Sequence, residues 1–254
     1  MKQVKAFVFL FAILSITIIS CSKEEDNGTE NPDIQTQLEL NRTRQGDFTQ
    51  VGKIHNEGLD YIFSPRTIQR IKDIAQPGKP VDTMAIASLI FQETNSFLKG
   101  KTIQADGMTI SLKEIDRLED ALAVFAENKM DKYEDCKGTL EERKSCIKDI
   151  MKEFAQNPFG RQYIQMMSAG SVYDYSLDYW TSNEELFISY FRNQQRGWFS
   201  WVSMAVSDVQ GAYSGAQIGA VGGPAGAIGG AVAFGLMGSA LNAAVQAAGH
   251  AAQQ

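Results

Sequence analysis

The sequence predicts an all-α protein, and three observations support this prediction. Apolar residues recur at helical spacing from Asp47 to Ala155. Serine or threonine followed by acidic residues marks several helix starts in the same region. Residues 209–254 contain no Lys, Arg, Asp or Glu, and their glycines recur at every fourth position. We therefore expect about five to seven helices in residues 47–208, followed by a Gly/Ala-rich helical hairpin and tail in residues 209–254.

The N-terminal segment predicts export. Lys2 and Lys5 precede an apolar run from Ala6 to Ile19, an order typical of a secretory signal peptide and too short for a membrane-spanning helix. The residues Ile18 to Cys21 also resemble the lipobox of bacterial lipoproteins. This resemblance implies that residues 1–20 are removed and that the Cys21 thiol is acylated. An ordinary signal peptide with a cysteine at its border is the alternative.

A polar tether is expected between the lipid and the helical domain. Residues 21–46 offer few apolar side chains to bury, so this stretch is predicted to be disordered. The acidic run Ser22 to Asp26 resembles the export tag of surface lipoproteins of the Bacteroidetes-type outer membrane. The resemblance implies an outer-membrane lipoprotein at the cell surface, held to the membrane by its N-terminal lipid.

The remaining cysteines and the net charge limit the chemistry. With Cys21 assigned to lipid, Cys136 and Cys146 are left in an exported chain, which favours one disulfide, with two free thiols as the alternative. Loss of residues 1–20 leaves a net charge of about −8, which disfavours nucleic acid as a partner. We expect no metal site and no cofactor.

Start and stop signals place the helices of the domain. The first helix is expected to bury one face formed by Val51, Ile54, Gly58 and Ile62. Predicted helix starts are Ser64 with Pro65 and the acidic motifs Ser111–Glu114, Thr139–Glu142 and Ser182–Glu185. Predicted stops are Gln76–Pro80 and Asn157–Gly160, and a tight β-hairpin is expected around Asp106 and Gly107.

An aromatic stretch precedes the last of these helix starts and is expected to be a loop. It contains Tyr173, Tyr175, Tyr179 and Trp180, with Asp174 and Asp178 between them. Two carboxylates beside aromatic rings suggest glycan binding or hydrolysis. The alternative is that the aromatic rings bury the loop against the helical core.

His55 is the only histidine near carboxylates, and it makes a poor metal site. On a helix, neither Glu57 nor Asp60 points in the same direction as His55. We therefore expect His55 to pack or to donate a hydrogen bond at a helix interface. The sequence also has no P-loop, GxSxG or HExxH motif, so we expect no enzymatic activity.

The glycine segment predicts a helical hairpin with arms of about 205–222 and 225–248. Stripping side chains from one ridge of a helix lets two backbones approach closely. The glycines expected to pack between the arms are Gly211, Gly215, Gly219, Gly223, Gly226 and Gly230. The second arm could span a bilayer by length, but its hydrophobicity is weak. The hairpin is expected either as the tight centre of the helical domain or as a segment for membrane insertion or self-association.

Residues 211–241 also resemble the glycine-zipper region of class II bacteriocins and related bacterial proteins. In that group, helices associate through GxxxG ridges in a target membrane. Those bacteriocins are short and cationic, whereas this chain is acidic and has a large helical domain before the zipper. The leading expectation is therefore a non-enzymatic surface lipoprotein, and the alternatives are a bacteriocin-like membrane-active protein and a glycan-binding or glycan-hydrolysing protein.

Overall fold

The computed structural model describes residues 47–126, 133, 135–158, 162–191 and 199–253, which all belong to the unit Arg44–Gln254. The signal peptide, Cys21 and the tether lie outside the described residues. The helices, in order along the chain, are α3 (Thr49–Ile62), α4 (Pro65–Ile74), α5 (Thr83–Leu98), α6 (Leu118–Ala126), α8 (Leu140–Ala155), α9 (Tyr163–Tyr190), α10 (Trp201–Gly219) and α11 (Gly223–Ala251). A short 3-10 helix, Ala220–Gly222, joins α10 to α11. The all-α prediction is confirmed, and within the described residues six α-helices precede the hairpin.

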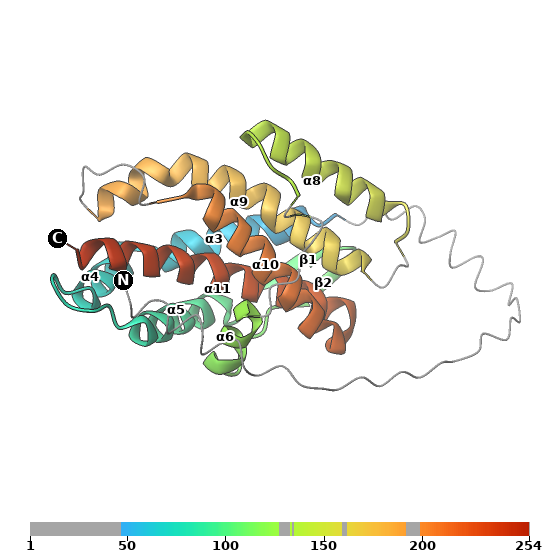
Figure 1. Cartoon of the computed structure of the whole chain (residues 1–254). Coiled ribbons are helices and arrows are strands. Elements are labelled where there is room, and N and C mark those ends of the chain that lie inside the picture. The colour runs from blue at the N-terminus through green and yellow to red at the C-terminus, as the bar shows by residue number, and fades with distance from the viewer. Residues whose placement is uncertain (1–46, 127–132, 134, 159–161, 192–198, 254) are drawn as a thin grey trace, which may run out of the picture. The chain divides into compact units, whose positions relative to one another are not determined.

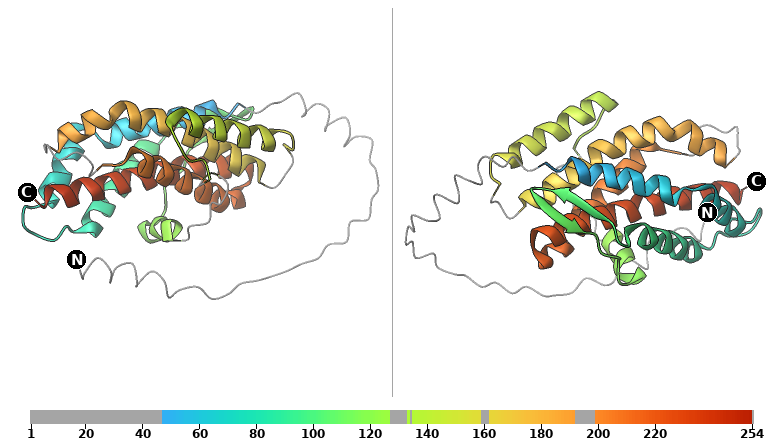
Figure 2. Two further views of the ribbon diagram at one scale, coloured as in Figure 1. Left: turned by 45° about the horizontal axis from the view of Figure 1, so that its top comes forward. Right: turned by 180° about the vertical axis from the view of Figure 1, so that it is seen from behind.

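Helix α11 lies in the middle of this unit, as Figures 1 and 2 show. It packs along α10 and also contacts α3, α4, α5, α6 and α9. Its buried residues include most positions from Ala227 to Ala248. A helix without Lys, Arg, Asp or Glu is thus the element around which the amphipathic helices are arranged, as expected from the free energy gained when apolar surface is buried.

Helix α3 packs against the centre through the face that the sequence predicts. Val51, Ile54, Gly58 and Ile62 are all buried. A Cβ atom on Gly58 would lie 2.5 Å from Cδ2 of Leu236 in α11, so this glycine allows the two helices to approach closely. The position of α3 against α11 therefore depends on the absence of a side chain at Gly58 as well as on the apolar residues of the buried face.

Several local sequence signals are confirmed. Thr139 and Glu142 form a reciprocal capping box at the start of α8. Strands β1 (Thr102–Ala105) and β2 (Met108–Ser111) pair in antiparallel register, and the turn residues Asp106 and Gly107 both have positive φ, 49° and 71°. A two-residue turn of this kind matches the twist of a β-hairpin.

Other local signals are overruled by tertiary structure. Ser111, expected to open a helix, instead pairs with Thr102 in the β-ladder, and the next helix begins at Leu118. Ser182–Glu185, expected to open a later helix, lies inside α9, which runs without a break from Tyr163 to Tyr190. The aromatic stretch 173–180 is therefore helix and not loop. A face of Tyr173, Ser176, Leu177 and Trp180 is buried at the three- and four-residue spacing of an α-helix.

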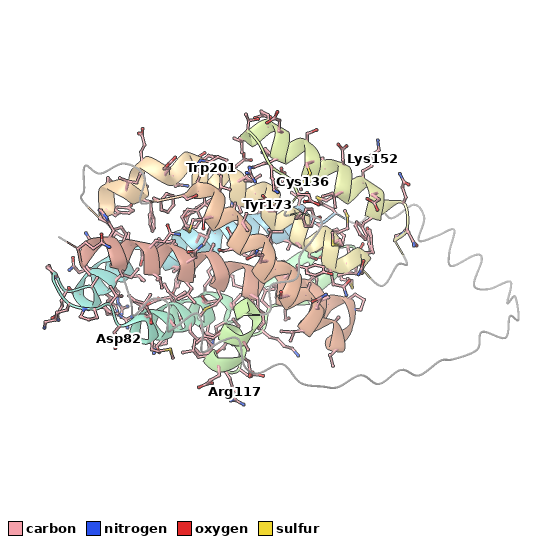
Figure 3. All side chains as sticks on the ribbon, in the orientation of Figure 1. Asp82, Arg117, Cys136, Lys152, Tyr173 and Trp201 are labelled. Atoms are coloured by element: carbon pink, nitrogen blue, oxygen red, sulfur yellow. A yellow bond between two sulfur atoms is a disulfide. The ribbon has the colours of Figure 1, made fainter. Side chains whose placement is uncertain are left out.

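The disulfide prediction is confirmed. Cys136 and Cys146 are bonded, which ties the segment before α8 to α8 itself. The same segment is held to α9 by Arg143, whose Nη1 donates to the Cys136 carbonyl at 2.6 Å and to the Tyr173 hydroxyl at 3.3 Å. Figure 3 shows Cys136 and Tyr173 in this region. The bridge therefore fastens α8 to the outside of the helical unit.

Candidate functional site: the glycine hairpin and its buried ion pair

The two arms of the hairpin touch backbone to backbone near the turn. A Cβ atom on Gly215 would collide with the Gly230 carbonyl, and one on Gly219 would collide with the Gly226 carbonyl. A Cβ atom on Gly226 would likewise collide with the Gly219 carbonyl, and one on Gly230 would collide with the Gly215 carbonyl. Four of the six expected packing glycines are thus two facing pairs, at positions where no side chain fits. Such close approach replaces side-chain contacts by dispersion and weak Cα–H···O contacts between main chains.

Gly223 has a different role from the one expected. Its φ is +75°, and a Cβ atom there would meet nothing within 4 Å. Gly223 therefore supplies the left-handed conformation of the turn before Pro224 and does not pack between the arms. Gly211, the remaining member of the expected ridge, is buried within α10.

Close packing continues from the glycine pairs along α11. A Cβ atom on Gly235 would lie 3.2 Å from Ala212 Cβ of α10 and 3.3 Å from Val172 Cγ1 of α9. Contacts at 3.2–3.3 Å are tighter than ordinary van der Waals separation. Gly235 thus marks the point where α9, α10 and α11 meet.

One fully buried ion pair fastens α10 to α3. Oδ1 of Asp208 lies 2.9 Å from Nε2 of His55, and both side chains have 0% exposure. The other carboxylate oxygen, Oδ2, accepts hydrogen bonds from Ser176 Oγ and from Trp180 Nε1, the latter at 2.9 Å. The last charged residue of the sequence is therefore joined to α3 and α9 at the start of the uncharged hairpin.

The surroundings of His55 favour its protonated form. The side-chain N–H₂ of Asn56 donates to the Tyr175 carbonyl at 3.0 Å, so its Oδ1 faces His55 Nδ1 as an acceptor, 3.1 Å away. Both ring nitrogens of His55 therefore face acceptors, an arrangement that favours an imidazolium over a neutral ring. Burial alone would lower the pKa of His55, but the charge of Asp208 and the hydrogen bonds with Asp208 and Asn56 outweigh burial and raise the pKa above its usual value.

This cluster combines histidine, aspartate and serine but is not built for nucleophilic catalysis. Ser176 donates to Asp208 and not to His55, so His55 cannot act as its base. All three side chains are fully buried, so the cluster offers no surface to a substrate. Among the residues that the structure describes, no group of three His, Cys, Asp or Glu side chains could hold a metal ion. The arrangement is suited to stabilising a helix junction.

The two carboxylates of the aromatic stretch, Asp174 and Asp178, both form ion pairs with one lysine. Lys144 Nζ of α8 lies 2.6 Å from Asp178 Oδ2 and 3.8 Å from Asp174 Oδ1. Burial raises the pKa of Asp174, although the charge of Lys144 opposes this shift. The carboxylates thus bridge α9 to α8.

Tyr179 and Trp180 of the same stretch face a site that lacks these carboxylates, whereas Tyr175 lies close enough to interact with their charges. Tyr173 is fully buried, while Tyr179 and Trp180 line a separate hollow of about 240 Å³ with Asp60, Phe63 and Asn183. That hollow contains neither Asp174 nor Asp178. The structure therefore does not bring the proposed acid and base to the hollow that Tyr179 and Trp180 line.

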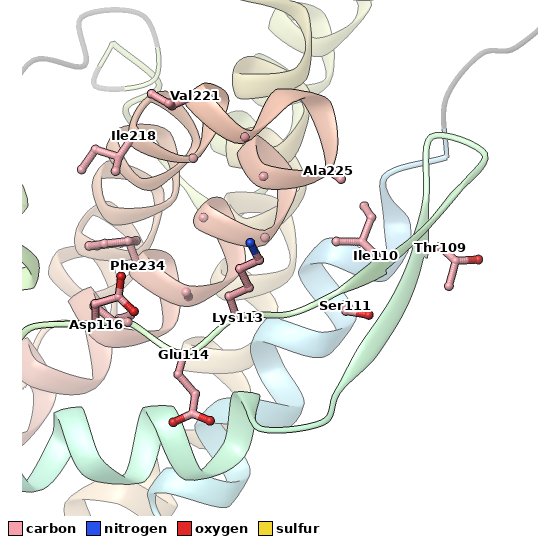
Figure 4. Close-up of a pocket in the computed structure, with 17 residues that line it drawn as sticks. Thr109, Ile110, Ser111, Lys113, Glu114, Asp116, Ile218, Val221, Ala225 and Phe234 are labelled. Atoms are coloured by element: carbon pink, nitrogen blue, oxygen red, sulfur yellow. The ribbon is translucent and has the colours of Figure 1, made fainter.

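A larger hollow lies beside the hairpin turn (Figure 4). It has a volume of about 590 Å³ and separates the turn from the segment 109–116. Its hairpin side is formed by glycines of both arms together with Ile218, Val221 and Phe234, and the facing segment carries Lys113. The hairpin is therefore exposed to solvent on this side, whereas most of the remainder of α11 is covered by the other helices.

Within the described residues, Trp201–Ala251 is the one stretch long and apolar enough to cross a membrane, with a mean hydropathy of 1.6 over its most apolar window. In this structure 72% of that window is buried by the other helices. Length and composition are therefore compatible with a membrane span, whereas the observed packing is that of a core.

Sequence reasoning identified His55 as an interface residue and Asp208 as the last charge, but it did not pair them. Ser176 and Gly52 were missed as packing residues, although a Cβ atom on Gly52 would lie 2.6 Å from the Ser171 carbonyl oxygen of α9. The isolation of Asp208 at the edge of a long uncharged segment was the available signal, because a carboxylate carried into a core needs a partner. Comparison of the chain with protein-family models, with curated proteins and with solved structures finds no match.

Proposed function

We propose that this chain is a non-enzymatic, lipid-anchored protein of the bacterial outer membrane, exposed at the cell surface, whose glycine hairpin serves as the packed centre of its exported domain. The observation that carries the proposal is the pair of backbone contacts, Gly215 with Gly230 and Gly219 with Gly226, within a hairpin covered by amphipathic helices. Such contacts form only when the two arms are held in one register, as the core of a folded domain requires.

The buried cluster supports a structural rather than a catalytic role. Asp208 receives three hydrogen bonds from three different side chains, and none of these donors reaches solvent. A polar network closed in this way specifies how helices assemble. The anchor part of the proposal rests on the lipobox-like residues before Cys21 and on the acidic run after it.

Mass spectrometry of the mature protein from the producing bacterium tests the anchor. The N-terminal peptide is expected to begin at Cys21 and to carry two or three acyl chains. A Cys21→Ser variant, which keeps every charge of the segment, is expected to leave the membrane fraction. An unmodified N-terminus at another residue, or a Cys21→Ser protein that stays in the membrane fraction, would overturn the anchored assignment.

A second candidate function is membrane insertion of the hairpin in a target cell. It is favoured by the length of α11, Gly223–Ala251, which at about 1.5 Å per residue exceeds the roughly 30 Å of a hydrocarbon core. It requires the arms to leave the helical unit, and therefore requires the Asp208–His55 pair to break. Hydrogen exchange of the α10 and α11 backbone amides, with and without vesicles, separates the two candidates.

A further inference from the structure

The hairpin turn is the most exposed apolar part of the described chain. Val221 is 96% exposed and Ile218 is 53% exposed, three residues apart. The remaining large apolar residues with high exposure, Tyr61, Met84 and Leu186, lie singly on α3, α5 and α9. No charged residue occurs in the hairpin beyond Asp208, so the turn, residues 218–225, presents only aliphatic side chains, glycine, alanine and proline. Paired aliphatic side chains at a tip are unfavourable in water and fit an apolar environment.

The chain enters the helical unit at the same end. The backbone N–H of Asp106, in the turn between β1 and β2, donates to the Asp47 carbonyl at 3.2 Å. Strand β2 in turn contacts α11 and lines the hollow beside the hairpin turn. Figure 4 shows the start of α3, the β-hairpin and the turn of the two long helices around this hollow. The tether therefore joins the unit next to the exposed apolar tip.

The length of the chain before Asp47 limits how far this end can lie from a lipid at Cys21. About 25 residues separate Cys21 from Asp47, so the two can be at most about 90 Å apart. A lipid at Cys21 thus holds the near end of the unit at high effective concentration over the bilayer. Two aliphatic side chains bind a bilayer weakly by themselves, and a tether makes such weak contact effective.

We propose that the hairpin turn is a membrane-contacting surface, on which the anchored domain rests with Ile218 and Val221 in the interfacial layer of the bilayer. The inference rests on the proposed anchor at Cys21. The segment facing the turn across the hollow carries Lys113 together with Glu114 and Asp116, all exposed, so the contact rests on the aliphatic tip and not on charge. The helical unit stays folded in this contact, and only its tip meets lipid.

Quenching of a single added tryptophan by brominated lipid tests this contact. In the mature chain, Cys136 and Cys146 are bonded, so the Cys21 thiol can be coupled to a maleimide headgroup lipid in phosphatidylcholine vesicles with brominated acyl chains. Val221→Trp places the probe on the turn. Met84→Trp is the matched control, because Met84 is 48% exposed and lies near Asp82 at the other end of the unit (Figure 3).

The coupled Val221→Trp chain is expected to lose most of the added emission and to shift to shorter wavelength, whereas the Met84→Trp chain should change little. Equal emission changes in the two coupled chains would overturn the proposal. A blue shift of Val221→Trp without vesicles, together with a dimer in light scattering, would overturn it in favour of a second copy of the chain. Because the coupling is chemical, these results do not depend on acylation in the cell, and a missing acyl group would overturn the anchored function alone.

Discussion

Replacing Asp208 by alanine is expected to destabilise the helical unit by about 3–5 kcal/mol, which is a large part of the stability of an ordinary domain. The change would leave the His55 imidazolium buried without its counter-ion. It would also leave the Ser176 hydroxyl and the Trp180 N–H without their acceptor. Urea unfolding followed by circular dichroism measures the loss.

The matched control is the ion pair between Arg70 and Glu93. Its N–O distance is also 2.9 Å, but its side chains are 41% and 15% exposed. Arg70→Ala is expected to cost about 1 kcal/mol or less, because solvent screens an accessible pair. Equal losses for Asp208→Ala and Arg70→Ala would mean that the buried pair contributes nothing beyond an ordinary surface contact.

The same pair predicts how stability depends on pH. The folded-state pKa of His55 is raised above the unfolded value near 6.5, so its stabilising contribution is complete below that value and is lost as the pH rises through the folded pKa. In Asp208→Ala, the two largest interactions that oppose burial are lost, so burial is expected to lower the pKa of His55. The pH dependence of unfolding near pH 6 is therefore expected to change sign in this variant and to disappear in His55→Gln.

Gly230→Ala is expected to destabilise the protein by about 1–3 kcal/mol, whereas Gly229→Ala is expected to stabilise it by up to about 1 kcal/mol. Both glycines lie in α11, and alanine is the better helix former at each position. A Cβ atom on Gly230 would meet the Gly215 carbonyl, while one on Gly229 would meet nothing within 4 Å. The difference between the two variants therefore isolates the contact between the arms.

Thermal and urea unfolding of these neighbouring variants gives the comparison without a change in charge or polarity. Gly219→Ala should behave like Gly230→Ala, because it faces the Gly226 carbonyl in the same way. If alanine stabilised the protein equally at 229 and 230, the glycine spacing would have no packing role.

The sequence features that predicted structure correctly are those whose interacting residues lie within a few positions of one another in the sequence. The Thr139–Glu142 capping box closes within one turn of α8, and the Asp106–Gly107 turn needs only two residues with positive φ. The four hairpin glycines that face one another are also close in sequence once a turn is placed at Gly222 and Gly223. Local chemistry decides these features, so they can be read from one sequence.

Features that depend on distant partners could not be predicted in this way. Ser111 and Ser182 have the same motif as Thr139, but one is in a β-ladder and the other inside a long helix. The Asp208–His55 contact joins residues 153 positions apart. The spacing of Tyr173, Leu177 and Trp180 did contain a helical signal, which was outweighed by the aromatic and acidic composition of the stretch. Tertiary packing overrides local propensity at each of these sites.

Hydrogen exchange of the backbone amides of α10 and α11 tests most directly whether the hairpin is the packed centre of the domain. In the mature, non-acylated chain, the buried amides of Met204–Ala216 and Ala227–Ala248 are expected to exchange only through global unfolding, at the same slow rate as those of α3 and α9. Adding phosphatidylcholine vesicles should leave this pattern unchanged. Rapid exchange in both arms while α3 and α9 stay protected, or loss of their shared protection when vesicles are added, would contradict the account and favour a hairpin that leaves the unit for the membrane.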